Sequence, residues 1–260
     1  MTDIRRLRIY RGTPAAGELR EYRVEAGVGM VVLDAVHKIQ AEQAPDLAVR
    51  WNCKAGKCGS CSAEINGRPR LLCMTRLSDY PPEQVLTVTP MKAFPLVQDL
   101  VTDVSWNYAV NLQIPPFTPR APDFPDGSWR MFQYEVERSQ EFRKCIECFL
   151  CQDVCHVLRT HGKHEEFIGP AFLVRAAAYE MHPLDVADRG AYLQDRGGLG
   201  YCNITKCCTE VCPESITITD NAIIPLKERV VTQRYDPLAW LWRTVTGRGK
   251  RRPAGGGSRG

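Results

Sequence analysis

Hydrophobic and polar residues alternate in two segments near the N-terminus, residues 7–11 and 19–24. Such alternation is typical of β-strands that bury one face. Residues 31–43 follow, with apolar side chains at positions 32, 35, 36 and 39, which is the spacing of an amphipathic helix. The start of the chain therefore predicts two strands and a helix that packs against them.

A hairpin and a further strand are expected next. Residues 62–65 lead into Asn66-Gly67, a dipeptide that favours a type I′ turn, and residues 70–73 return. Residues 85–88 have the composition of a last strand. These elements predict a small mixed sheet with one helix, in a first domain over residues 1–112.

The pattern changes after residue 112. Residues 113–130 contain five prolines, which favour an extended connector because proline sustains neither a helix nor a central strand. Beyond it we expect helices over 134–147, 170–180 and 221–231, in an α-helical domain that spans residues 131–236. Residues 237–260 are rich in glycine and basic residues, a composition typical of a solvated, disordered end.

Composition and charge indicate an ordinary globular protein. The chain has 260 residues, 44% of them hydrophobic and 25% charged, and a net charge of +4 that is too small to indicate nucleic acid as a partner. Arg5-Arg6 is not followed by an apolar segment, so we expect no export signal. No apolar stretch reaches the roughly 20 residues of a membrane-spanning helix. The sequence therefore predicts a cytoplasmic protein.

The twelve cysteines fall into three groups with distinct spacings. A cytoplasmic chain keeps its thiols reduced, so grouped cysteines favour metal binding over disulfides. The first group has three cysteines in one loop that also holds Gly56 and Gly59, and a fourth in the returning hairpin strand. This is the plant-type ferredoxin spacing of a [2Fe–2S] cluster, whereas a zinc ribbon favours two separate cysteine pairs. The predicted ligands are Cys53, Cys58, Cys61 and Cys73, in a β-grasp ferredoxin-like domain.

The second group has the spacing of bacterial ferredoxins. Cys145, Cys148 and Cys151 recur every third residue, and the fourth ligand of such a cubane comes from a cysteine before a proline in a distant motif. Here that residue is Cys212, which precedes Pro213. The sequence predicts a [4Fe–4S] cluster on these four cysteines.

By the same crossing rule Cys155 joins Cys202 and Cys208. Three thiolates suit a [3Fe–4S] cluster, and the position where a cubane would take another cysteine holds Thr205. Adjacent cysteines rarely bind one metal together, so we expect Cys207 to be a buried thiol that is not a ligand. The alternative is that Cys207 completes a second [4Fe–4S] cluster.

The arrangement resembles the iron–sulfur subunit of succinate dehydrogenases and fumarate reductases. The resemblance is carried by Cys53-x4-Cys58-Gly-x-Cys61, by Arg143-Lys144-Cys145-Ile146-x-Cys148-x2-Cys151-x3-Cys155 and by Cys202-x5-Cys208-x3-Cys212-Pro213. It spans the chain from the first strand to about residue 236. It implies an α+β fold, a β-grasp [2Fe–2S] ferredoxin-like domain followed by an α-helical ferredoxin domain.

The resemblance also implies a function within respiratory complex II, a succinate:quinone oxidoreductase. Electrons would pass from FAD in a partner flavoprotein through the [2Fe–2S], [4Fe–4S] and [3Fe–4S] clusters to menaquinone or ubiquinone at a membrane-anchor subunit. The chain would be a peripheral protein at the cytoplasmic face of the cell membrane. This resemblance assigns it no catalytic residue, because succinate binds to the flavoprotein.

Two positions depart from the pattern of the family. Many members have proline after the cysteine that matches Cys155, and a tryptophan five residues after that cysteine, which helps to form the quinone pocket. This sequence has His156 and Thr160 there. The usual quinone pocket is therefore not predicted beside the last cluster.

Three alternatives to succinate oxidation are open. The same relay run in reverse would be a quinol:fumarate reductase. A free ferredoxin-like carrier would be strongly acidic, which the near-balanced charge of this chain disfavours. A structural zinc protein would be colourless and would not react with reductants.

Overall fold

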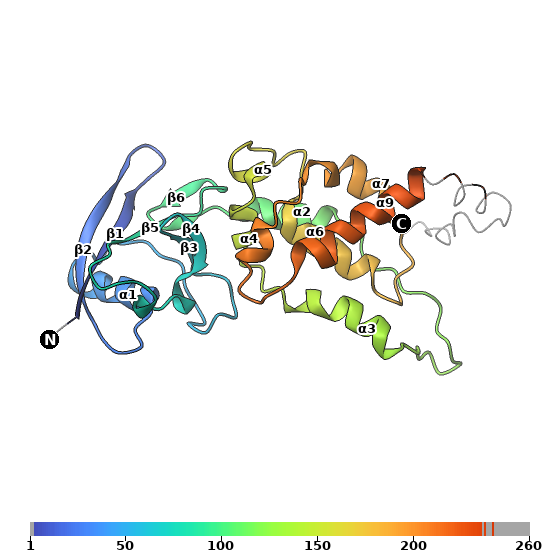
Figure 1. Ribbon diagram of the computed structural model, residues 1–260, viewed down its shortest axis with the longest axis horizontal. Helices are drawn as coiled ribbons and strands as arrows, with labels where there is room; N and C mark the ends of the chain where they lie inside the picture. Colours follow the sequence, from blue (N-terminus) through green and yellow to red (C-terminus); the bar gives the residue numbers. More distant parts are fainter. Residues whose placement is uncertain (1–2, 236, 238–240, 242–260) are drawn as a thin grey trace, which may run out of the picture.

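The computed structural model describes residues 3–235, 237 and 241. The tail predicted over residues 237–260 lies almost wholly outside these residues. A sheet with one helix occupies the N-terminal half, and a group of helices occupies the C-terminal half beside it (Figure 1). The predicted α+β fold of two successive domains is confirmed.

The N-terminal half contains a five-stranded sheet of order β2-β1-β5-β3-β4. Strands β1 and β2 pair antiparallel over their whole length, and β5 runs parallel to β1 and antiparallel to β3. The strands are β1 (Asp3–Gly12), β2 (Gly17–Ala26), β3 (Ser62–Ile65), β4 (Arg68–Leu71) and β5 (Leu86–Thr89). The predicted strands are confirmed except at the return of the hairpin, and β1 and β2 extend beyond the predicted segments. The strand expected over 70–73 ends at Leu71, and the 3₁₀ turn η1 (Leu72–Met74) follows it and carries Cys73.

Helix α1 (Val32–Glu42) covers this sheet with its apolar face. The four positions that the sequence pattern singled out, 32, 35, 36 and 39, are all fully buried. They share one core with Leu7 and Ile9 of β1. At the β3–β4 turn Asn66 and Gly67 both have positive φ, 50° and 76°, as a type I′ turn requires. The sheet and its helix thus form a rigid support for the loop between α1 and β3, which carries the first three cysteines.

Between the halves lie elements that the sequence pattern did not predict. They are β6 (Leu96–Gln98), β7 (Val101–Thr102) and α2 (Ser105–Gln113). Met91, Phe94 and Val110 from this stretch lie in the core of the helical half. The domain limits at residues 112, 130 and 236 stay predictions.

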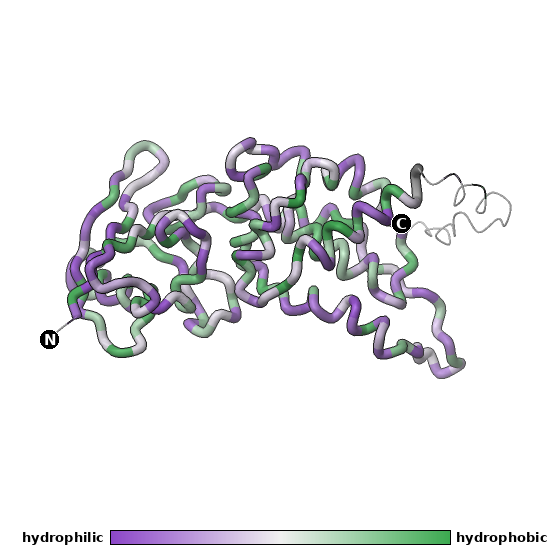
Figure 2. Tube along the Cα trace, viewed as in Figure 1, coloured by the Kyte–Doolittle hydropathy of each residue, from purple (hydrophilic) through white to green (hydrophobic). Residues whose placement is uncertain are grey.

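The C-terminal half is built from short helices joined by cysteine-bearing turns. They are α3 (Gln133–Gln140), η3 (Glu141–Lys144), α4 (Leu150–Asp153), α5 (His156–Arg159), α6 (Gly169–Glu180), α7 (Gly190–Asp195), η4 (Leu199–Tyr201), α8 (Cys207–Glu210), η5 (Ile218–Ile223) and α9 (Ile224–Tyr235). Helix α6 is mostly hydrophobic and central, whereas α3 is mostly hydrophilic (Figure 2). Among the described residues, no helix combines the length and apolarity that crossing a membrane requires.

Two predicted helices differ from the observed ones in their limits. The helix expected over 134–147 is α3 followed by the 3₁₀ turn η3, because the chain must turn at Cys145 to bring its thiol inward. The helix expected over 221–231 begins as the π-helix η5 and continues as α9, with Pro225 in the first turn of α9. The helix expected over 170–180 is confirmed as α6.

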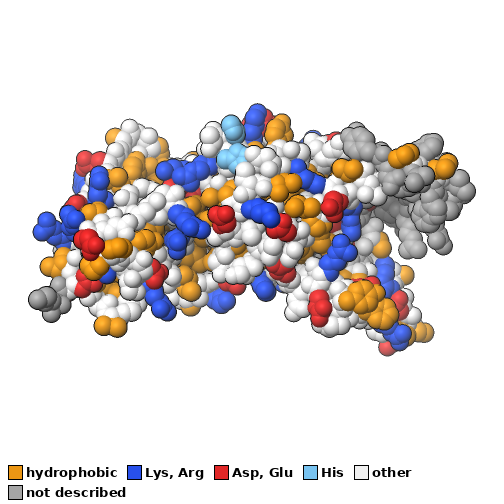
Figure 3. Space-filling model, in the orientation of Figure 1, with side chains coloured by type: hydrophobic (Ala, Val, Ile, Leu, Met, Phe, Trp, Pro, Cys, Tyr) orange, Lys and Arg blue, Asp and Glu red, His pale blue; other side chains and the backbone are white. Residues whose placement is uncertain are grey.

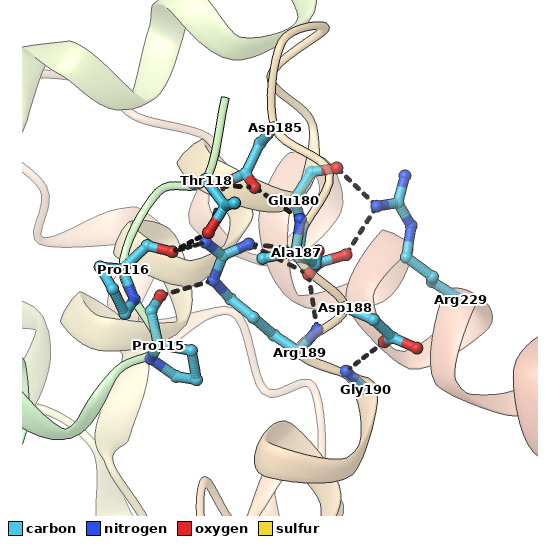
Figure 4. Close-up of polar contacts among 10 residues, drawn as sticks. All are labelled: Pro115, Pro116, Thr118, Glu180, Asp185, Ala187, Asp188, Arg189, Gly190 and Arg229. Carbon is cyan, nitrogen blue, oxygen red and sulfur yellow. Dashed lines mark hydrogen bonds and ion pairs between the residues drawn. The ribbon is translucent and has the colours of Figure 1, made fainter. Parts of the chain in front are cut away.

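The proline-rich connector is held by one buried arginine. Arg189 is completely buried, and its guanidinium donates to the carbonyl oxygens of Pro115 at 2.8 Å and Pro116 at 2.7 Å (Figure 4). It also pairs with Asp185 at 2.8 Å and Glu180 at 3.4 Å, two carboxylates that are themselves buried. Residues 114–130 of the connector form no helix or strand, and these hydrogen bonds fix its start to the helical half. The prediction that it is extended is wrong over 123–128, where Asp123 N donates to the Ser128 carbonyl at 3.0 Å and the chain turns back.

Candidate iron–sulfur sites

The first group of cysteines lies in a loop whose backbone amides point at sulfur. Lys57 N donates to Cys53 Sγ at 3.2 Å, Ala55 N donates to the same sulfur at 3.4 Å, and Cys53 N donates to Cys58 Sγ at 3.5 Å. Gly56 supplies the positive φ of 67° that this tight turn needs. Such amide–sulfur contacts stabilise thiolates and tune the potential of a bound cluster.

The thiols of the first group lie close enough to one another to shift each other's pKa values. Burial is the largest influence on the Cys61 thiol, and together with the neighbouring Cys73 and Cys58 thiols it raises the pKa of Cys61 to about 12 against a hydrogen bond from the Cys73 amide. Burial also acts on Cys58, but hydrogen bonds from Ser60 and the Cys53 amide outweigh it and lower the pKa of Cys58 to about 6. Because the thiolate is the metal ligand, these thiols would lose their protons on binding iron.

The four cysteines of the second group line one cavity. Apolar side chains of Ile146, Phe149, Val174 and Ile216 close the cavity around the thiols of Cys145, Cys148, Cys151 and Cys212. Burial, followed by the charges of the other three thiols and Cys208, raises the pKa of Cys151 well above its usual value. Glu147 and Phe149 adopt positive φ, 53° and 60°, which wraps the chain around this cavity. The structure therefore brings Cys212 to the three clustered cysteines, as the crossing rule predicts.

The third group holds four thiols. Burial is the largest cause that raises the pKa of Cys155 to about 11. Hydrogen bonds from the amides of Leu158 and Val157 oppose this shift, and the nearby thiols of Cys207 and Cys202 add to it. Burial is likewise the largest cause for Cys208, and together with the neighbouring thiols of Cys207, Cys202 and Cys155 it raises the pKa of Cys208 to about 11 against a hydrogen bond with Thr219. The predicted set of Cys155, Cys202 and Cys208 is thus together, and Cys207 lies beside it. The expectation that Cys207 is buried is wrong, because the residue is half-buried at the start of α8.

The three groups follow one another in space. Gly59 of the first loop packs against Cys148 of the second group so closely that an added Cβ would lie 2.5 Å from Cys148 Cα. Ser62 Oγ donates to the Cys148 carbonyl at 2.8 Å, and Lys57 pairs with Glu214, next to Cys212-Pro213, at 3.5 Å. The charge of Cys208 in the third group contributes to the raised pKa of Cys151 in the second. The second group therefore lies between the other two.

Replacing Gly59 by alanine is expected to slow electron transfer between the first and second sites. Its φ of +67° is strained for alanine by about 1–2 kcal/mol, and the new methyl group would meet the Cys148 backbone. Gly56→Ala is the matched control, because Gly56 has the same φ but an added Cβ meets only the flexible Met74 side chain. Rapid-freeze EPR after mixing with reductant measures the transfer. Equal rates in the two variants would show that the contact has no such role.

A buried ion cluster beside the sites was not predicted from the sequence. Glu64 of β3 and Asp153 of α4 are completely buried, and Arg159 of α5 forms an ion pair with Glu64. Lys92 pairs with Glu64 at 3.2 Å, and Ala93 N donates to Asp153 at 3.0 Å. Burial, followed by the Glu64 charge, raises the pKa of Asp153 to about 7 against the Ala93 amide and Arg159. These residues join the two halves, but their burial is invisible in a local sequence pattern.

The donor sets fit clusters of several irons. Within the described part of the chain, no three or more His, Cys, Asp or Glu side chains converge as a single metal ion requires. A multi-iron cluster separates its thiolates more widely than a single metal ion does, and cysteine is its usual ligand. When bound, such clusters would supply one-electron transfer, and the chain would hold them by thiolate bonds, amide–sulfur contacts and burial.

The two positions that depart from the family pattern lie together near the third group. His156 begins α5 directly after Cys155, and Thr160 follows the end of this short helix. The His156 ring lies 6.1 Å from that of His161.

On the face of the molecule that Figure 3 shows, basic and acidic side chains are interspersed, and neither sign of charge dominates.

Comparisons with known proteins define the class. Residues 6–108 match a 2Fe-2S iron-sulfur cluster binding domain, and residues 141–216 match a 4Fe-4S dicluster domain. The protein is therefore an iron–sulfur protein with two ferredoxin-type domains in one chain. It belongs to the family of iron–sulfur subunits of succinate dehydrogenases and fumarate reductases, and the resemblance seen in the cysteine motifs is confirmed.

Three relatives support this membership. The fumarate reductase iron-sulfur subunit of Mycobacterium tuberculosis is 33% identical over 232 residues, which cover 88% of this chain and 92% of the relative. The succinate dehydrogenase iron-sulfur subunit of Paracoccus denitrificans is 30% identical, with 88% and 89% covered. A chain of the Mycobacterium smegmatis Sdh1 complex in the apo form is 62% identical, with a TM-score of 0.88, and the match covers 92% of this chain and all of that one.

Proposed function

We propose that this chain relays electrons from a flavoprotein subunit that carries FAD to quinone at a membrane-anchor subunit, within a succinate:quinone oxidoreductase. The observation that supports this most is the succession of three cysteine groups, with the second in contact with the first and electrostatically coupled to the third. A chain that relays electrons needs several redox centres in succession, whereas an enzyme with one redox reaction site needs only one redox centre.

The proposed ligands follow the three groups. Cys53, Cys58, Cys61 and Cys73 would hold [2Fe–2S], Cys145, Cys148, Cys151 and Cys212 would hold [4Fe–4S], and Cys155, Cys202 and Cys208 would hold [3Fe–4S]. The cavity lined by four thiols supports the second set. The chain itself would bind no succinate, and its part in catalysis would be to position the clusters. We further propose that the anchor holds it as a peripheral protein at the cytoplasmic face of the cell membrane.

Exposed aromatic side chains favour a subunit of a complex over a free carrier. They gather in the connector and at the start of α3, where each of the following is at least 40% exposed: Phe124, Trp129, Phe132 and Tyr134. Neighbouring large apolar side chains on a surface mark contacts with other proteins. The relatives include subunits of both a fumarate reductase and a succinate dehydrogenase. Fumarate reduction is therefore the alternative to the proposed oxidation of succinate.

Reduction by succinate tests this function. In the complex isolated with its partners, anaerobic succinate is expected to bleach the visible absorption of the clusters, and fumarate added to the reduced complex is expected to restore part of it. Dithionite serves as the control that shows the clusters to be reducible. Clusters that dithionite reduces and succinate leaves oxidised would contradict the proposal.

A further inference from the structure

Eleven of the twelve cysteines have a place in the three proposed clusters, and Cys207 does not. It begins α8, directly before the proposed ligand Cys208. The two adjacent thiols have different partners, because Cys207 Sγ lies 3.3 Å from Thr205 Oγ1 and Cys208 Sγ lies 3.6 Å from Thr219 Oγ1. The Cys207 side chain is therefore directed to a position of its own.

That position has a counterpart in the second group. In the second motif the cysteine three residues after Cys145 is Cys148, one of the four thiols that line the cubane cavity. In the third motif the residue three after Cys202 is Thr205, which cannot supply a thiolate. Since Cys207 Sγ touches the Thr205 hydroxyl, a thiol is present where the sequence of the third motif lacks one.

The surroundings of Cys207 support metal binding. Cys207 is half-buried, whereas Cys155 and Cys208 are buried. The nearest basic side chain along the chain, Lys206, is paired with Asp220 at 2.8 Å, which leaves its charge partly neutralised.

We propose that Cys207 binds a fourth, ferrous iron at the third site, which would convert its [3Fe–4S] cluster into [4Fe–4S] when the site is reduced. This inference rests on the proposed function, because it takes the [3Fe–4S] cluster as the starting state. In the step, [3Fe–4S]⁰ and Fe²⁺ combine to [4Fe–4S]²⁺, the Cys207 sulfur forms a bond to the new iron, and its proton passes to solvent. The electron that produces [3Fe–4S]⁰ arrives through the relay.

Iron uptake by the complex tests the proposal. The complex with its native partners is reduced with dithionite, incubated anaerobically with ⁵⁷Fe²⁺ and freed of unbound iron by gel filtration. Mössbauer spectroscopy is expected to show one added iron per chain in a cubane. EPR after mild reoxidation is expected to show loss of the near-isotropic three-iron signal. Ferricyanide in excess should then remove one electron and release Fe²⁺, which returns the signal.

Two variants separate this site from unspecific iron binding. Cys207→Ser is expected to keep the three-iron signal and take up no iron. Adding Thr205→Cys to that variant places a thiol at the equivalent position and is expected to restore uptake. Equal uptake by Cys207→Ser would mean an adventitious ion only and would overturn the proposal, as would absence of uptake in the unaltered complex. A complex without any three-iron signal before iron is added would instead contradict the proposed function.

Discussion

Replacing Cys212 by serine is expected to remove the [4Fe–4S] cluster and to leave the [2Fe–2S] signal unchanged. Cys212 comes from the third motif, about sixty residues after the other three ligands, yet its thiol lines the same cavity as theirs. Serine is a poor ligand for iron because its hydroxyl holds its proton far more tightly than a thiol does. Loss of this thiol therefore leaves the cubane one ligand short at a buried site.

Iron analysis and EPR of the reduced complex measure this effect. The expected result is a loss of about four irons per chain, the content of one cubane, and of electron transfer from succinate to quinone. Cys207→Ser is the matched control, because it makes the same chemical change five residues earlier and is expected to leave all three clusters in place. Loss of the [2Fe–2S] signal in Cys212→Ser, with the cubane retained, would contradict the crossing assignment.

Replacing Arg189 by alanine is expected to lower the free energy of unfolding of the helical half by about 3–5 kcal/mol, the cost of breaking a buried ion pair from one side. The change leaves the carboxylates of Glu180 and Asp185 buried with fewer partners. It also removes the donors that hold Pro115 and Pro116 of the connector. The connector should therefore detach from the helices when the arginine is lost.

Urea denaturation followed by circular dichroism measures the change as a shift of the unfolding midpoint. Arg20→Ala is the control, because Arg20 and its partner Glu18 are both largely exposed. An exposed pair contributes about 0–1 kcal/mol, so this variant should unfold close to the unaltered protein. If both variants unfold at the same urea concentration, the buried arginine does not have the stabilising role assigned to it.

Local patterns predicted the elements that depend on local chemistry. Asn66-Gly67 fixes a turn through its own backbone preferences, and the apolar positions of α1 repeat with the helical period, so both are visible in the sequence. The helix expected up to residue 147 ended at residue 140. Its limit is set by the turn that carries Cys145 inward, which is a tertiary requirement.

Contacts between distant residues explain what the sequence did not predict. The sequence indicates only that Gly59 lies in a loop, and the fold shows that Cys148 packs against it. Glu64 and Arg189 belong to residue types that are usually exposed. Glu64 is buried because Arg159, far along the chain, compensates its charge. Arg189 is buried because Asp185 and Glu180 nearby compensate its charge and the distant carbonyls of the connector accept its remaining donors. The cysteine groups could be predicted because the geometry of a cluster imposes a spacing on its ligands.

Low-temperature EPR of the complex, isolated with its native partners, tests the relay most directly. The air-oxidised sample is expected to show the near-isotropic signal of a [3Fe–4S] cluster. On reduction this signal should vanish, and a rhombic [2Fe–2S] signal should appear. An oxidised sample without a signal, with two interacting cubanes on reduction, would contradict the three-cluster assignment and make Cys207 a permanent ligand.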